Sequence, residues 1–314
     1  MRADATAITT EGLTKFYGAV RGVEGLDLDV HQGEIYGFLG PNGAGKTTTL
    51  RLLLDLIRPD SGTASVLGLD VRRERATLHR EIGYLPGEFV VWPELTGREN
   101  LAYLGRLRGG VPEAAVAALA ERLELDLGKK FHTYSHGNKQ KLGLIQAFMH
   151  RPRLLLLDEP TGGLDPLVQN TFAEMLDDVR DEGRTVFLSS HVLSEVERTC
   201  DRVGIIREGT LVEVARVSEL GMGGTHLVRM TFAQAIDPAP FRRVPGVGGV
   251  VVESGGRVVT ATAQGEPKPL LELALTYPLL EFESRRPSLE ELFLHLYGAS
   301  TPVLDSDTAE QPRV

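Results

Sequence analysis

Residues 40–48 read GPNGAGKTT, and the segments before and after this stretch are interpreted from it. The pattern is a glycine, four further residues, and then Gly45, Lys46 and Thr47. Glycines let successive backbone N–H groups turn towards phosphate oxygens, because they have no Cβ. In such a loop we expect Lys46 to reach the β- and γ-phosphates of a nucleotide and the Thr47 hydroxyl to hold Mg²⁺. The residues predicted to contact the nucleotide are Gly40, Pro41, Asn42, Gly43, Ala44, Gly45, Lys46, Thr47 and Thr48.

The flanks of this loop have the structure that phosphate binding needs. Residues 34–39 form a short apolar run, which predicts a buried strand. Apolar side chains then recur at helical spacing over residues 50–57, and Pro59 follows the expected end of that helix. A helix that begins at Gly45 directs its positive end at the phosphates. A glycine-rich turn that carries a lysine by chance would not have both flanks, so phosphate binding is the favoured interpretation.

Composition excludes several classes of protein. A chain of 314 residues with 42% hydrophobic content is typical of a globular protein with room for two domains. No apolar run is long enough to span a bilayer, and the first fifteen residues lack the apolar core of a secretory signal. The single cysteine, Cys200, excludes an internal disulfide and indicates a reducing compartment. A net charge of −9 argues against nucleic acid as a partner.

The segments beside the loop predict a sheet that precedes and follows it. Residues 6–17 and 25–30 contain short alternating stretches broken by glycines, which predict an antiparallel sheet. Tyr17, at a strand end, is interpreted either as an aromatic plate for a nucleotide base or as one more half-buried strand residue. Further elements are expected at residues 63–67 (a strand), 72–81 (a solvated helix) and 81–86 (a buried strand).

Residues from about 93 to 150 predict a helical insertion. Thr96 and Glu99 have the spacing of a capping box, so a helix is expected to begin there. Pro112 opens a second helix, and a third begins near Ser135. Trp92, at the entrance, is interpreted as a packing residue rather than a ligand.

The run LLLLDEP, residues 154–160, predicts a strand buried on both faces with two carboxylates at its end. The carboxyl end of a central parallel strand is where a doubly wound sheet binds its ligand. Asp158 is expected to hold Mg²⁺ through its water shell, and Glu159 to orient and deprotonate an attacking water. The alternative is an acidic pair at a helix N-terminus, which the phosphate loop upstream makes less favoured. A further strand, residues 185–190, ends at His191. A lone histidine is more often structural than catalytic, but at a strand end beside a phosphate site it is well placed to hold a γ-phosphate oxygen.

A second domain is expected after a linker marked by Gly221, Gly223 and Gly224. Its predicted order is strand, helix, strand, strand, helix, strand, which is typical of a ferredoxin-like split unit. The domains are therefore expected at residues 1–217 and 218–298, and residues 299–314 are predicted to be a disordered tail. The expected strands are 226–232, 247–253, 257–262 and 279–283, and the expected helices are 240–243, 269–276 and 288–297.

Taken in order, the motifs over residues 8–214 resemble the ATP-binding subunits of ABC transporters. Tyr17 matches the base-stacking aromatic of that family, and Asp158 and Glu159 match its magnesium aspartate and catalytic glutamate. Asp165, in the stretch GGLD, matches the loop through which two subunits touch, and His191 matches the switch histidine. The resemblance implies that Lys46, Glu159 and His191 are the catalytic residues.

The signature segment of the family usually reads LSGGQ, and residues 134–138 read YSHGN here. Ser135 and Gly137 match, whereas His136 and Asn138 depart from the pattern. The resemblance implies that Ser135 and Gly137 bind the γ-phosphate held by a partner subunit, through a helix N-terminus that offers N–H groups and a hydroxyl.

One further departure concerns the metal. After the strand IGYLP the family normally has a glutamine whose oxygen reaches Mg²⁺, and this chain has Gly87 followed by Glu88. Glycine has no side chain to coordinate with. Because a carboxylate serves a hard cation at least as well as an amide, the hypothesis is that Glu88 takes over as a metal-sensing ligand.

The resemblance implies a fold and an activity. The expected fold is α/β, a P-loop ATPase with an antiparallel β subdomain, a helical insertion and a small α+β C-terminal domain. The ending PSLEELFLHLYG resembles the accessory domain of drug or natural-product exporters of the multidrug or daunorubicin type. The implied function is ATP hydrolysis with Mg²⁺ by a pair of subunits, which drives a separate membrane permease from the cytoplasmic face of the membrane. Two alternatives remain: an ABC ATPase acting on ribosomes or DNA, and an ATP-dependent module that sequesters a toxic compound.

Overall fold

The structure is a computed structural model that describes residues 5–220 and 225–285. The chain divides into two compact units, Met1–Val217 and Ser218–Val314, and each is described by itself. The first unit contains the phosphate loop and the acidic strand, so it holds the candidate site.

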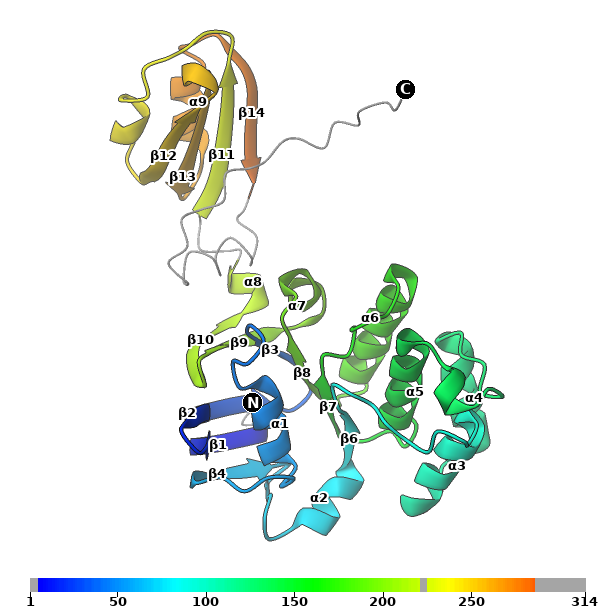
Figure 1. Ribbon diagram of the computed structural model, residues 1–314. Coiled ribbons are helices and arrows are strands. Elements are labelled where there is room, and N and C mark those ends of the chain that lie inside the picture. Colours follow the sequence, from blue (N-terminus) through cyan, green and yellow to red (C-terminus); the bar gives the residue numbers. More distant parts are fainter. Residues whose placement is uncertain (1–4, 221–224, 286–314) are drawn as a thin grey trace. The chain divides into compact units, whose positions relative to one another are not determined.

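A six-stranded sheet with the order β10-β9-β3-β8-β7-β6 forms the centre of the first unit (Figure 1). Neighbours from β9 to β6 are parallel, and β10 pairs with β9 in the antiparallel sense. Every residue of the three central strands is buried, as the apolar runs of β3 and β7 predicted for those two strands. Because these strands are parallel, their carboxyl ends meet at one edge. The bounds are β3 Ile35–Leu39, β6 Ile82–Leu85, β7 Leu154–Asp158, β8 Thr185–Ser190, β9 Arg202–Arg207 and β10 Thr210–Arg216.

A second sheet of the first unit is antiparallel, which confirms the prediction for the segments beside the loop. Its order is β2-β1-β4-β5. Apolar side chains from this sheet, from the helix α1 (Lys46–Leu53) and from the central strands share one core, which includes Ile8, Leu50 and Phe187. The bounds are β1 Thr6–Tyr17, β2 Val20–His31, β4 Ser61–Val66 and β5 Leu69–Asp70.

The helical insertion consists of α3 (Gly97–Leu107), α4 (Glu113–Arg122) and α5 (His136–Phe148), which gather beside β6 and β7 (Figure 1). The predicted capping box is present: Thr96 accepts a hydrogen bond from Glu99 N, and the Glu99 side chain accepts one from Thr96 N. Trp92 stacks edge-on against Tyr103 with ring centroids 4.5 Å apart, yet it remains 45% exposed. The short helix α2 (Arg75–Glu81) buries only Leu78, as expected of a solvated helix. A 3₁₀ turn, η1 (Phe131–Thr133), precedes α5.

Several elements of the first unit have no counterpart in the sequence-based prediction. They are α6 (Pro166–Asp181), α7 (Leu193–Thr199), α8 (Val217–Leu220) and the strands β5, β9 and β10. The helix α6 has an ordinary start signal, because Asp165 accepts hydrogen bonds from Leu167 N and Val168 N and Pro166 follows it. Asp165 is therefore a helix cap in this structure.

The second unit is a four-stranded antiparallel sheet with the order β12-β13-β11-β14, in agreement with the predicted succession of strands. The expected first helix is only a 3₁₀ turn, η2 (Phe241–Arg243), which follows Pro238 and Pro240. Phe241 is buried there against Phe232. The expected helix 288–297 and tail 299–314 lie outside the described residues. The bounds are β11 Thr225–Phe232, β12 Val247–Glu253, η3 Ser254–Gly256, β13 Val258–Gln264, α9 Lys268–Ala274 and β14 Leu279–Arg285.

Candidate active site

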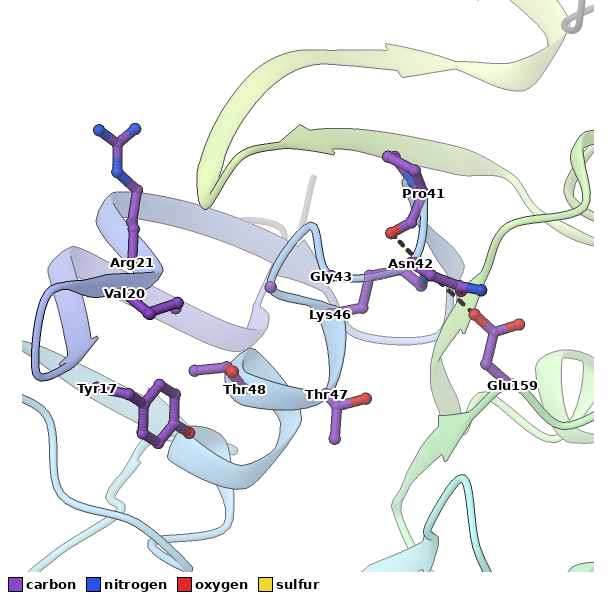
Figure 2. Close-up of a pocket in the computed structure, with 12 residues that line it drawn as sticks. Tyr17, Val20, Arg21, Pro41, Asn42, Gly43, Lys46, Thr47, Thr48 and Glu159 are labelled. Carbon is purple, nitrogen blue, oxygen red and sulfur yellow. Dashed lines mark hydrogen bonds and ion pairs between the residues drawn. The ribbon is translucent and has the colours of Figure 1, made fainter.

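A pocket of about 310 Å³ lies between the phosphate loop and the turn that joins β1 to β2 (Figure 2). Most of the predicted nucleotide contacts line it together with Glu159, whereas Gly40 and Ala44 lie behind the lining. Val20, Arg21 and Gly22, which sequence reasoning did not single out, also line it. The lining residues are Tyr17, Val20, Arg21, Gly22, Pro41, Asn42, Gly43, Gly45, Lys46, Thr47, Thr48 and Glu159.

Gly45 shapes the phosphate loop through its backbone. Its φ of 112° is a conformation that L side chains rarely adopt, and an added Cβ would lie 2.5 Å from the carbonyl oxygen of Gly22. Gly45 is also the N-cap of α1 and offers no side-chain cap. Because the first amides of a helix have no partner within it, the start of α1 is available to an anion in the pocket.

Lys46 is held at the centre of the site with only 6% of its surface exposed. Its Nζ donates to the carbonyl oxygens of Gly40 (2.6 Å) and Pro41 (3.2 Å), and it forms an ion pair with Glu159 Oε1 at 3.1 Å. Figure 2 shows this ammonium between the loop and the acidic strand. A buried ammonium is stabilised only when it is paired, so a phosphate group that enters the pocket would meet a preorganised cation.

Asp158 ends β7 and faces two hydroxyl groups. Thr47 Oγ1 donates to Asp158 Oδ2 at 2.8 Å, and Ser189 Oγ donates to Asp158 Oδ1 at 2.6 Å. Hydroxyl and carboxylate oxygens are the donors that a hard divalent cation prefers, so the Thr47–Asp158 pair fits such an ion. The described residues contain no group of three or more His, Cys, Asp or Glu side chains that could hold a metal.

Glu159 follows Asp158 in a left-handed backbone conformation, with φ of 48°. Its N–H donates to Ser189 Oγ (3.1 Å) and lies 3.2 Å from the Ser189 carbonyl oxygen. The carboxylate then lies between two cationic or polar groups, with Oε1 near Lys46 and Oε2 2.8 Å from His191 Nδ1. The structure thus brings Lys46, Glu159 and His191, the three predicted catalytic residues, into one hydrogen-bonded group.

Tyr17 lines the open end of the pocket and is 45% exposed. An added Cβ on Gly22 would lie 3.0 Å from Tyr17 Cε2 and 3.1 Å from Thr48 Cγ2, so the ring lies directly over this glycine. Lys15 Nζ is 5.9 Å from the ring centroid. The exposed ring is available for stacking on a base, and that role remains a prediction.

The predicted partner-facing residues do not line this pocket. Ser135 is the N-cap of α5 and accepts a hydrogen bond from Asn138 N at 3.3 Å. Gly137 lies against the loop that follows Glu159, because an added Cβ would be 2.5 Å from the carbonyl oxygen of Gly163. Ser135 and Asp165 are exposed, and their contact with a partner subunit remains a prediction.

Position 87 faces the Asp158 carboxylate. An added Cβ on Gly87 would lie 3.3 Å from Asp158 Oδ2. Glu88 is exposed, and its part in metal binding remains a prediction. Tyr84, on the strand before this loop, has its pKa raised to about 12, first by burial and then by the charge of Asp158, so it stays a neutral phenol.

Two residues that hold the site together were not predicted from the sequence. Ser189 holds both Asp158 and the Glu159 amide, and Gln140 of α5 donates to the carbonyl oxygens of Glu159 and Pro160. Ser189 gives a weak signal, since it is a polar residue at the end of an apolar strand. Gln140 gives none, because its partners are backbone atoms from a distant segment.

Proteins of similar sequence are named as ATP-binding proteins, in agreement with a nucleotide site at this pocket. The family described as ABC transporter matches residues 23–162. The daunorubicin/doxorubicin resistance ATP-binding protein DrrA of Streptomyces peucetius is 37% identical over 97% of this chain and 96% of its own. The linearmycin resistance ATP-binding protein LnrL of Bacillus subtilis (strain 168) is 34% identical over 93% of this chain and 98% of its own. The bacitracin transport ATP-binding protein BcrA of Enterococcus faecalis is 44% identical over 68% of this chain and 70% of its own.

A solved structure of an ATP-binding subunit of an ABC transporter superposes with a TM-score of 0.64 and 30% identity. The match covers 69% of this chain and 92% of that chain. Within the described residues, no helix has the length and apolar character needed to cross a membrane. The phosphate loop, the acidic strand and the near-full-length similarity agree, so the chain belongs to the ABC transporter family and is one of its ATP-binding, ATP-hydrolysing subunits.

Proposed function

We propose that two copies of this subunit drive a separate membrane permease that exports a drug or another small hydrophobic compound. The observation that supports export is the extent of the similarity to DrrA and LnrL, which covers 97% and 93% of this chain. That extent includes the second unit, whose described residues, 218–220 and 225–285, do not line the nucleotide pocket. In this arrangement the subunit works at the cytoplasmic face of the cell membrane as a peripheral protein.

The nucleotide site is completed by the second copy. The pocket holds Lys46 and Thr47 beside Asp158, yet its lining includes neither Ser135 nor Gly137. The start of the thirteen-residue helix α5 offers N–H groups to an anion. A partner subunit would bring its Ser135 and Gly137 to the γ-phosphate bound by Lys46, so each of the two sites is composite.

The residues of the first copy have distinct tasks in hydrolysis. Lys46 exchanges Glu159 and two carbonyl oxygens for phosphate oxygens, which frees the Glu159 carboxylate to accept a proton from water. Thr47 and Asp158 would hold Mg²⁺, which when bound neutralises charge on the phosphates. His191 keeps the Glu159 carboxylate oriented through Nδ1, and it would hold a γ-phosphate oxygen of the bound nucleotide.

Export is tested in cells. Deletion of this gene from its source organism should raise the accumulation of daunorubicin, measured by its fluorescence, or sensitivity to linearmycin or bacitracin. The parent gene should restore export, and the Glu159→Gln variant should not, because that amide cannot take the proton from water. Unchanged accumulation and sensitivity for all three compounds would contradict drug export. Action on ribosomes or nucleic acid is not favoured, because the net charge is −9 and the relatives are named for transport or resistance.

A further inference from the structure

Gln140 is a buried polar residue of α5 that lies outside the pocket, with only 3% of its surface exposed. Its Nε2 donates to the carbonyl oxygen of Glu159 at 3.1 Å and to that of Pro160 at 3.0 Å. Carbonyl oxygens only accept, so the amide nitrogen must face them. Both donor hydrogens of this amide are thereby committed to the peptide that carries the proposed catalytic base.

The Glu159 backbone needs such support. Its φ of 48° is a conformation that residues other than glycine seldom adopt and that persists only where the surroundings hold it. Ser189 fixes the N–H of Glu159, and Gln140 fixes its carbonyl group. The two contacts together determine the direction of the side chain, which meets Lys46 on one oxygen and His191 on the other.

The helix α5, which carries Gln140, contacts the segment 159–163 at a second point. Gly137, three residues earlier, lies so close to Gly163 that an added Cβ would be 2.5 Å from its carbonyl oxygen. The Glu159 carbonyl also accepts from Gly162 N at 3.2 Å, which closes the turn. The start of α5 and the segment 159–163 therefore form one packed body, and a shift of that helix start moves Glu159 with it.

We propose that Gln140 is a positioning residue for Glu159. It holds the left-handed peptide of the base and links it to the helix start that carries Ser135. This inference rests on the proposed function, in which Glu159 accepts the proton and Ser135 meets the partner's nucleotide. Loss of the amide leaves the phosphate loop untouched, so ATP binding is retained while the carboxylate loses its alignment.

The test compares steady-state ATP hydrolysis and ATP affinity of the purified full chain with those of Gln140→Met. Methionine keeps the length and volume of the side chain but donates no hydrogen bond. We expect kcat to fall at least about tenfold and the Kd for ATP to change less than about threefold, because misplacement of a catalytic group by about 1 Å can reduce the rate a hundredfold. Gln146→Met is the matched control, since Gln146 is also buried on α5 and lies six residues further along.

A second variant separates positioning from simple filling of the core. In Gln140→Glu the ionised carboxylate cannot donate to the two carbonyl groups, whereas the protonated form donates one hydrogen bond. The kcat of this variant relative to that of the parent should rise at least about threefold from pH 8 to pH 6. This variant also decides the matter if thermal unfolding shows that Gln140→Met does not fold.

Three results would overturn the inference. The first is a kcat of Gln140→Met equal to that of Gln146→Met, and the second is a loss of ATP affinity in Gln140→Met as large as its loss of kcat. The third is a ratio of the Gln140→Glu kcat to the parent kcat that does not change between pH 8 and pH 6. Glu159→Gln, assayed beside them, separates the two proposals. If Glu159→Gln hydrolyses ATP as the parent does, the proposed base is wrong. If Glu159→Gln is inactive and Gln140→Met is not impaired, the positioning role alone is wrong.

Discussion

Gly87 leaves one side of the Asp158 carboxylate without a covering side chain, because an added Cβ on this glycine would lie 3.3 Å from Asp158 Oδ2. The backbone at this position does not have a positive φ, so a larger residue is compatible with it. Residues 87 and 88 form a bend rather than a strand, and the alternation of side chains along a strand does not fix the direction of Glu88. Glu88 is exposed and close in sequence to the site.

The first prediction concerns these two positions. If Glu88 joins the metal shell, Glu88→Ala should need about three to ten times more Mg²⁺ for half-maximal ATP hydrolysis, because an oxygen ligand is lost. The double variant Gly87→Gln with Glu88→Ala should recover in part, since an amide oxygen is restored beside Asp158. The measurement is the magnesium dependence of steady-state hydrolysis.

Glu94→Ala serves as the control for that series, because Glu94 is an exposed carboxylate of the same connection that pairs with Lys130. A magnesium requirement of Glu88→Ala equal to that of Glu94→Ala and the parent would show that Thr47 and Asp158 suffice.

Four elements meet at the side chain of Arg108, the C-cap of α3. Its Nη1 donates to the carbonyl oxygens of His79, in α2, and Ile82, at the start of β6, and lies 2.9 Å from Nε2 of His150, after α5. Burial and the neighbouring Arg108 charge lower the pKa of His150 to about 4. This contact connects the helical insertion to the central sheet.

The second prediction is a pH dependence of stability with a defined sign. His150 has a pKa near 4 in the folded chain and 6.5 as its ordinary value, so between these values the unfolded chain binds a proton that the folded chain does not. The contribution of His150 to the free energy of unfolding is therefore fully present above pH 6.5 and falls as the pH drops towards 4. Because solvent screens this partly exposed group, we expect the free energy of unfolding at pH 5 to be lower by about 1 kcal/mol.

Urea unfolding of the parent and His150→Gln at pH 7.5 and pH 5 measures this contribution. The variant should lose about 1 kcal/mol less than the parent on acidification. An equal acid loss in the parent and His150→Gln would contradict the assignment.

The elements that were predicted share a strong local signal. The strands β3, β7 and β8 have continuous apolar runs, and α3 has a complete capping box. The 3₁₀ turn η2 was expected to be a regular helix, but two prolines and the buried Phe241 hold it to a single turn. The side chains of the site could be named from motifs. Their mutual contacts could not, because Ser189 and Gln140 meet Glu159 only after distant segments have packed.

The two units of the molecule have separate hydrophobic cores. The first surrounds α1 and the central strands, and the second is built from residues such as Met230, Phe232 and Phe241. Among the residues that the structure describes, all those that line the nucleotide pocket belong to the first unit. Loss of the second unit therefore removes none of them.

The third prediction follows from this division. A chain truncated after Val217 should bind ATP with a Kd within about threefold of the parent value, because every pocket-lining residue is retained. Its association into pairs or with the permease should weaken, since the second unit is available to support assembly. Binding of a fluorescent ATP analogue and sedimentation velocity measure the two properties. Loss of nucleotide binding in a truncated chain that unfolds cooperatively would contradict the division.

In the proposed composite site, Ser135 and Gly137 come from a second copy, so hydrolysis would be second order in subunits. Free copies at low concentration would seldom meet, whereas two copies bound to one permease face each other at an effective concentration in the millimolar range. In the proposed assembly, the permease would act as a template that raises the local concentration of the ATPase subunits. Dilute free subunits would then hydrolyse ATP slowly, and assembled transporters would account for most of the ATP consumed.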